Sequence, residues 1–173
     1  MADFIGVPTS DIANTDWSSS GSNFYTEVDS GESSSTVDYV QKTGGTGTLK
    51  FGLTLPSDVT RFGSVAGRNC YGHFNIRDFG GGDGDYHTLS AQIFKSDGTT
   101  PLTDQITNKQ SSSGTKNIVL AFTTTAEDAA SWEDAQLHIG LSDEGEGELY
   151  RIYNAYIHMT YLTTAEEVLR PDA

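Results

Sequence analysis

Apolar side chains recur at every second position in several short stretches of this chain. In 49–55, leucine and phenylalanine occupy the odd positions, whereas Lys50 and Thr54 lie between them. The same alternation appears in four further stretches: 74–77, 89–93, 118–122 and 137–141. A period of two residues is that of a β-strand with one buried face. In 118–122 the intervening residues, Val119 and Ala121, are also apolar, which predicts a strand buried on both faces.

The longest predicted strand runs from about 151 to 162, and its two faces differ. Its odd-numbered residues are expected to face the core: Tyr153, Ala155, Ile157, Met159 and Tyr161. Its even-numbered residues are of mixed polarity: Ile152, Asn154, Tyr156, His158 and Thr160. A mixed face suits a groove or a subunit contact better than open water, and Tyr156 is its candidate interface residue.

Tyrosines are densest at the start of this strand, and such a group is a candidate for an aromatic sugar-binding platform. Alternation predicts that Tyr150 and Tyr156 share one face, with Tyr153 on the other. This spread favours core and interface packing over a flat platform.

Turn-forming residues separate the predicted strands, and the chain contains 19 glycines. Many short strands joined by such turns predict one domain, 1–173, with an all-β fold. We expect an antiparallel β-sandwich with jelly-roll topology and very little helix. One helical turn is expected around Trp132, within 125–134. A short C-terminal helix is expected after Thr164, which forms a capping-box pattern with Glu167.

The two chain ends, 1–10 and 163–173, are expected to act as contact arms, because their apolar residues lie in segments too short for a full strand or helix. The candidate interface residues at these ends are Phe4, Ile5, Val7, Val168 and Leu169. Each large side chain would contribute roughly 1.5–3 kcal/mol if it were buried against a neighbouring protein.

The net charge of the chain disfavours two classes of binding partner, nucleic acids and anionic membranes. Its 24 acidic and 10 basic residues give a formal net charge of −14. No Lys/Arg cluster is visible along the sequence, so we expect no binding to nucleic acid or to an anionic membrane. The chain has no apolar run long enough to cross a bilayer and no signal-peptide pattern at its start, so synthesis in a host cytoplasm is expected.

Candidate chemistry is sparse. Asp78, Asp83 and Asp85 lie in a glycine-rich loop and are weak candidates for calcium ligands. Their spacing does not match that of the calcium-binding loop in helical calcium-sensor proteins. The four histidines show no metal-ligand spacing, and the single cysteine, Cys70, is expected to be a small buried residue. No nucleophile elbow, P-loop or dinucleotide motif is present. We therefore expect no catalytic residues, no cofactor and no enzymatic activity.

Two groups of residues form a recognisable pattern along most of the chain. The first group is Ser10, Asp11, Ile12, Trp17, Tyr25, Val28, Asp29, Asp38, Tyr39 and Val40. The second is Leu89, Ala91, Ile93, Phe94, Ser96, Asp97, Gly98, Trp132, Asp134, Leu137 and Ile139. The pattern resembles a β-sandwich module of tailed-bacteriophage virion proteins, which include capsid decoration (cement) proteins and head or tail accessory proteins. Family members often carry a proline just after the tryptophan, whereas Trp17 is followed by Ser18.

The resemblance implies a structural virion protein, often a trimer, without catalytic residues. We expect a capsid decoration protein that binds the major capsid protein and forms a homo-oligomer, with a trimer as the first expectation. The acidic charge favours the outer surface of the head, since the interior is filled with DNA. The alternative is a carbohydrate-binding or receptor-binding accessory module of the virion, because jelly rolls host both functions.

Overall fold

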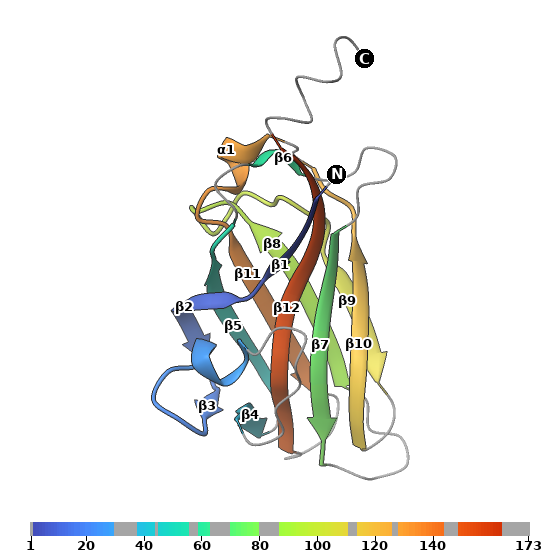
Figure 1. The fold of residues 1–173 in the computed structure, drawn as a ribbon. Coiled ribbons are helices and arrows are strands. Elements are labelled where there is room, and N and C mark those ends of the chain that lie inside the picture. Colours follow the sequence, from blue (N-terminus) through green and yellow to red (C-terminus); the bar gives the residue numbers. More distant parts are fainter. Residues whose placement is uncertain are drawn as a thin grey trace.

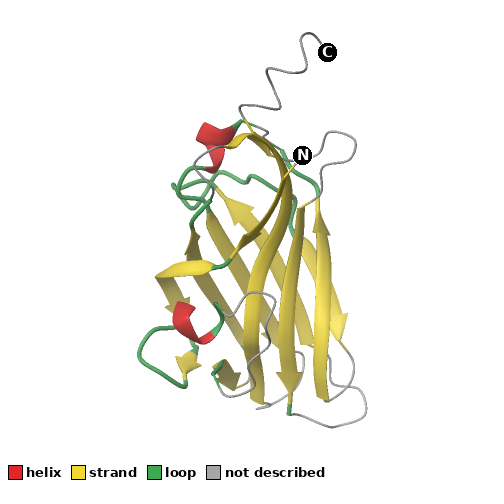
Figure 2. Cartoon of the chain, in the orientation of Figure 1, coloured by secondary structure: helices red, strands yellow, loops and turns green. Residues whose placement is uncertain are grey.

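A computed structural model shows the fold of the chain (Figures 1 and 2). The structure describes residues 2–29, 38–43, 45–55, 59–62, 70–79, 87–110, 114–125, 128–143 and 149–163. The predicted C-terminal helix, with Val168 and Leu169, lies outside the described residues, as do Asp83 and Asp85.

Strands make up most of the described chain. They are β1 (Ala2–Gly6), β2 (Pro8–Thr15), β3 (Ser18–Ser19), β4 (Val40–Thr43), β5 (Thr46–Leu53), β6 (Val59–Phe62), β7 (Cys70–Asp78), β8 (His87–Phe94), β9 (Ile106–Gln110), β10 (Gly114–Phe122), β11 (Gln136–Asp143) and β12 (Leu149–Thr163). The described helices are a single 3₁₀ turn (Tyr25–Glu27) and α1 (Ala129–Trp132). The predicted helical turn around Trp132 is therefore confirmed.

The strands form two antiparallel sheets packed face to face (Figure 1). The seven-stranded sheet has the order β10-β7-β12-β4-β3, and β1 and β6 also pair with β12. The five-stranded sheet has the order β2-β5-β11-β8-β9. The run β4-β12-β7-β10 opposite β5-β11-β8-β9 is the strand order of a jelly roll, in which successive strands cross between the sheets except at β8 and β9, which pair with each other. The predicted β-sandwich is confirmed.

The core lies between the sheets and is built from the alternate apolar positions of the strands. Leu49, Phe51 and Leu53 of β5 are buried, as are Leu137 and Ile139 of β11. Cys70 is also buried in the core, as expected for a small apolar residue. Burial raises the pKa of its thiol, so the thiol stays protonated at neutral pH.

One expectation about β10 is wrong. Ile118, Leu120 and Phe122 are buried, but Val119 is 54% exposed and Ala121 is also exposed. The strand is the last in the order of its sheet, and only its inner face is covered by the opposite sheet. Apolar residues on both faces therefore did not indicate burial on both faces.

A second correction concerns β12, where a β-bulge changes which residues face the core. The register with β7 shifts between Ile152 and Asn154, so Tyr153 has no partner in this ladder. Before the bulge the even residues Tyr150 and Ile152 are in the core. After it the odd residues face the core, as predicted, from Ala155 to Tyr161. An extra residue on one strand inverts the alternation, which a strict period of two cannot anticipate.

A third correction concerns the N-terminal segment. Phe4 and Ile5 were expected to lack a strand of their own, but they lie in β1, which pairs with β12 from Ala2 opposite Tyr161 to Gly6 opposite Ile157. Phe4 packs against the core and is only partly exposed. Pairing with a long neighbouring strand stabilises a segment that alternation alone left unassigned.

Candidate functional site

The outer face of the seven-stranded sheet carries polar and aromatic side chains in register across three strands. We call it the outer face, and its central residues come from β7, β10 and β12. They are Tyr71, His73, Asn75, Asn117, Val119, Asn154, Tyr156 and His158. The inward neighbours Phe74 and Ile76 anchor β7 in the core, so the residues between them must point outward.

The pairing registers place these residues in rows. Asn75 lies opposite Asn117 on one side and Asn154 on the other. In the next row His73 lies between Val119 and Tyr156. The bulge at Tyr153 is what directs Asn154 and Tyr156 outward together with the residues of β7. Residues from three distant parts of the sequence thus converge on one surface.

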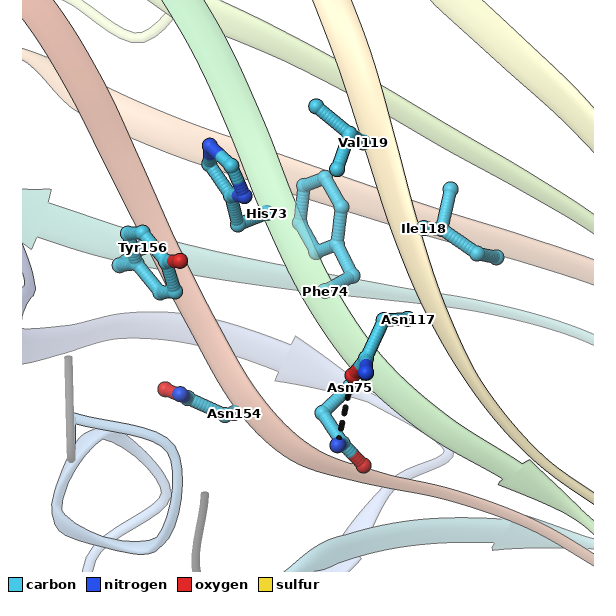
Figure 3. Close-up of a pocket in the computed structure, with 8 residues that line it drawn as sticks. All are labelled: His73, Phe74, Asn75, Asn117, Ile118, Val119, Asn154 and Tyr156. Carbon is cyan, nitrogen blue, oxygen red and sulfur yellow. Dashed lines mark hydrogen bonds between the residues drawn. The ribbon is translucent and has the colours of Figure 1, made fainter. Parts of the chain in front are cut away.

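A depression of about 290 Å³ occupies this surface (Figure 3). It is lined by His73, Phe74, Asn75, Asn117, Ile118, Val119, Asn154 and Tyr156. We call it the amide depression, after its three asparagines. Nδ2 of Asn75 donates a hydrogen bond to Oδ1 of Asn117 over 2.8 Å, drawn as the dashed line in Figure 3. Oδ1 of Asn75 is buried and accepts no hydrogen bond from the described residues.

An aromatic pair forms the other side of the amide depression. The rings of His73 and Tyr156 stack in parallel, with centroids 4.5 Å apart and an interplanar angle of 2°. This spacing is at the close end of the range for stacked aromatic side chains. The depression therefore has an aromatic wall beside its amide groups.

A second, smaller depression of about 180 Å³ lies on the five-stranded sheet. Its lining includes His138, whose ring stacks on Phe94 with centroids 4.3 Å apart. Nε2 of His138 lies 3.0 Å from Oε1 of Gln136. Burial, with a smaller contribution from the charge of Lys50, lowers the pKa of His138 to about 4. The ring is therefore neutral at neutral pH.

The structure describes four of the sequence-predicted interface residues, and it places Ile5 opposite His158, two residues from Tyr156 on β12. Tyr156 lines the amide depression, whereas Phe4 and Ile5 lie in β1 and Val7 directly follows it. Asp78 is the last residue of β7. Among the described residues, no group of three or more His, Cys, Asp or Glu side chains could hold a metal ion.

Sequence reasoning missed the amide depression. Strict alternation predicted Tyr156 as an interface residue and placed Tyr150 on the same face, because the bulge between them cannot be read from the local pattern. Asn75 and Asn117 drew no attention, since isolated asparagines within strands carry no signal of their own. The only available hint was the amides of Asn75 and Asn154 within two predicted strands, with Asn117 directly before the stretch 118–122.

None of the described helices is long and apolar enough to span a membrane.

Neither a protein-family model nor a curated protein matches the sequence. Among solved structures, an arabinose-bound α-L-arabinofuranosidase, MgGH51, is similar with a TM-score of 0.51 and 10% identity, over 83% of this chain and 23% of that one. The carbohydrate-binding module TmCBM61, in complex with β-1,4-galactotriose, has a TM-score of 0.41 and 13% identity over 71% of each chain.

The enzymatically active domain of tailspike protein 4 from bacteriophage CBA120 has a TM-score of 0.43 and 8% identity, over 91% of this chain and 19% of that one. This chain thus spans about a quarter of the arabinofuranosidase and about a fifth of the tailspike domain. At such identities the similarity to the arabinofuranosidase shows a shared β-sandwich fold.

Proposed function

We propose that this protein is a carbohydrate-binding module, acting as a glycan- or receptor-binding accessory, and that the amide depression is its ligand site. The observation that carries the proposal is the convergence of three asparagine side chains and a stacked His73–Tyr156 pair in one depression of the outer face.

The chemistry of the depression matches that of a sugar. A sugar presents hydroxyl groups, which both donate and accept hydrogen bonds, and C–H faces, which are apolar. A side-chain amide offers donors and an acceptor within one group. Oδ1 of Asn75 is buried and accepts no hydrogen bond from the described residues, so a small shift of this side chain would give it a ligand hydroxyl as its partner. The ring of Tyr156 supplies apolar surface beside it.

The size of the site supports a small ligand. A volume of about 290 Å³ lies at the lower end of small-molecule pockets, which span roughly 300–1,000 Å³. The fully buried centre of a homo-oligomer interface is more apolar than the rest of the surface. Rows of amide and imidazole groups are therefore better suited to a short saccharide than to a second copy of the chain.

The test is binding of the full chain to a glycan array, followed by titration calorimetry on the sugars that bind. The array includes arabinose and β-1,4-galactotriose, the sugars present in two structures of similar fold. Tyr156→Ala and Asn75→Ala should each weaken binding by about tenfold or more, which corresponds to about 1.4 kcal/mol.

A matched control compares two histidines. His73→Ala removes a stacked ring from the amide depression, whereas His138→Ala removes a stacked ring from the opposite sheet. The first should weaken binding and the second should not, provided that circular dichroism and thermal melts show both variants folded. Failure of the wild-type chain to bind any glycan, or equal binding by Tyr156→Ala, would contradict the proposal.

We place this module on the virion of a tailed phage, as the sequence resemblance implies. The more specific role of a capsid decoration protein, bound to the major capsid protein, stays a prediction from that resemblance.

A further inference from the structure

Two arginines face each other on the outer face, beside the amide depression. Arg77 of β7 and Arg151 of β12 are direct partners in the antiparallel register. Both guanidinium groups lie over the ring of Phe79, at 4.4 and 4.6 Å from its centroid. The guanidinium of Arg151 also lies 3.9 Å from the ring centroid of Tyr39. No basic cluster is visible along the sequence, because these arginines meet only through the pairing of β7 with β12.

This arrangement carries an electrostatic cost. Like charges directly opposite each other on neighbouring strands destabilise a sheet. Within the part of the chain that the structure describes, no carboxylate forms an ion pair with either arginine. The chain has only 10 basic residues against 24 acidic ones. Placing two of the ten side by side concentrates positive charge at one point of an acidic molecule.

The contacts that the two arginines make with other described residues hold the pair together and do not neutralise its charge. Cation–π contacts with Phe79 and Tyr39 support the guanidinium planes but leave their charge in place. Nε of Arg151 donates a hydrogen bond to Oε1 of Gln41 over 3.2 Å, which orients the planar guanidinium group. Arg77 is exposed and Phe79 is 39% exposed, so solvent and ligands can reach the cluster.

The cluster and the amide depression lie within reach of one ligand. The Arg77–Arg151 row is followed on the same face by the row of Asn75 and Asn154. On β7 these two rows are two residues apart, or roughly 6–7 Å, and on β12 the bulge adds one residue between them. A saccharide that occupies the amide depression can therefore extend to the arginines.

We propose that Arg77 and Arg151 form an anion subsite that binds the carboxylate of an acidic sugar, such as a uronic acid. The inference rests on the proposed function and specifies its ligand class. A planar guanidinium fork matches a planar carboxylate with two parallel hydrogen bonds, and a bound carboxylate offsets the repulsion between the arginines. A single negative charge suits a site in a protein of net charge −14 better than a polyphosphate does.

The experiment uses pairs of oligosaccharides that differ only at the charged group. Oligogalacturonate, oligoglucuronate and sialyllactose are each compared with the carboxyl-reduced form, by titration calorimetry on the full chain. At least one acidic member should bind about tenfold more tightly than its reduced partner, and the preference should fall as salt rises.

Variants then assign that preference to the arginines. Arg77→Gln combined with Arg151→Gln should abolish the preference for the acidic sugar over its reduced partner. Arg151→Lys keeps the charge but loses the planar fork, so it should lose most of the preference. Lys50→Gln is the matched control, since it removes one positive charge from the opposite sheet, and it should retain the preference.

Each contrary outcome has a separate meaning. Equal binding of acidic and reduced sugars, or a preference that survives the double arginine variant, would overturn the anion subsite while the carbohydrate-binding proposal stands. Tighter binding of sulfated or phosphorylated sugars than of uronates would overturn the carboxylate assignment. If no sugar of any kind binds, the proposed function itself fails.

Discussion

His73 and His138 show how the same residue type can serve different roles in this protein. Each ring is partly buried and stacks on an aromatic side chain, but they lie on opposite outer surfaces of the sandwich. His73 faces three asparagines, whereas His138 lies beside Gln136 and near Lys50. Stacking and partial burial are therefore not signs of a binding site by themselves, because the neighbouring donors and acceptors decide what a ligand could meet.

The depressed pKa of His138 predicts a loss of stability in mild acid. Its pKa of about 4 in the folded protein lies below the ordinary value of 6.5, so the unfolded chain binds more protons between these values. The free energy of unfolding must then decrease as pH falls from about 6.5 to about 4. Because the ring is partly exposed, we expect a discounted contribution of about 1–2 kcal/mol.

Urea denaturation of wild type and His138→Gln at pH 7 and pH 4 checks this effect. The variant should lose less stability across the interval than wild type does. Lys50→Gln is the control, since it removes the smaller cause of the shift and leaves burial intact. Identical losses in wild type and His138→Gln would show that other groups account for the acid sensitivity.

At the scale of the element, the bulge in β12 determines which of its residues enter the core and which lie on the outer face. The bulge places the side chain of Ile152 in the core and those of Asn154 and Tyr156 on the outer face. Tyr153, at the bulge, is buried and packs edge-on against Tyr39 with ring centroids 6.0 Å apart. One inserted residue thus lets a single strand contribute even-numbered residues to the core at one end and to the surface at the other.

Truncation of Ile152 tests the bulge directly. Ile152 is 0% exposed, so Ile152→Ala should lower the free energy of unfolding by about 2–5 kcal/mol. Ile12, in β2, is 44% exposed, and Ile12→Ala is the matched control with an expected change within about 0.5 kcal/mol. Urea denaturation measures both. If both variants changed the free energy of unfolding by a similar small amount, the even-numbered residues of β12 would all be exposed and the bulge would be absent.

At the scale of the whole molecule, the two sheets of the sandwich expose faces of different character. The outer face of the seven-stranded sheet carries the amide depression and the paired arginines, whereas the five-stranded sheet carries the smaller depression around His138. A trimer, expected from the sequence, and a saccharide cannot both cover Tyr156. Under the proposed function, any homo-oligomer must use surfaces other than the amide depression.

Light scattering tests this separation of surfaces. The mass of the wild-type particle should be the same with and without a bound sugar, and Tyr156→Ala should leave it unchanged. A net charge of −14 per chain opposes association, but the repulsion is screened beyond about 8 Å at physiological salt, so the measurement is made there. A trimer that dissociates in Tyr156→Ala would assign the outer face to subunit contact instead.

The sequence by itself determined the positions of six strands (β5, β7, β8, β10, β11 and β12), the β-sandwich fold and the helical turn at Trp132. These features follow from local alternation and from turn residues, which act over a few positions. The tertiary structure alone decided which face of β12 enters the core, that β1 pairs with β12, and that Arg77 meets Arg151. Cross-strand register joins residues far apart in the sequence, and a single bulge inverts every side chain beyond it. Neither effect leaves a mark in the local pattern, so the amide depression and the paired arginines emerge only once the strands are paired.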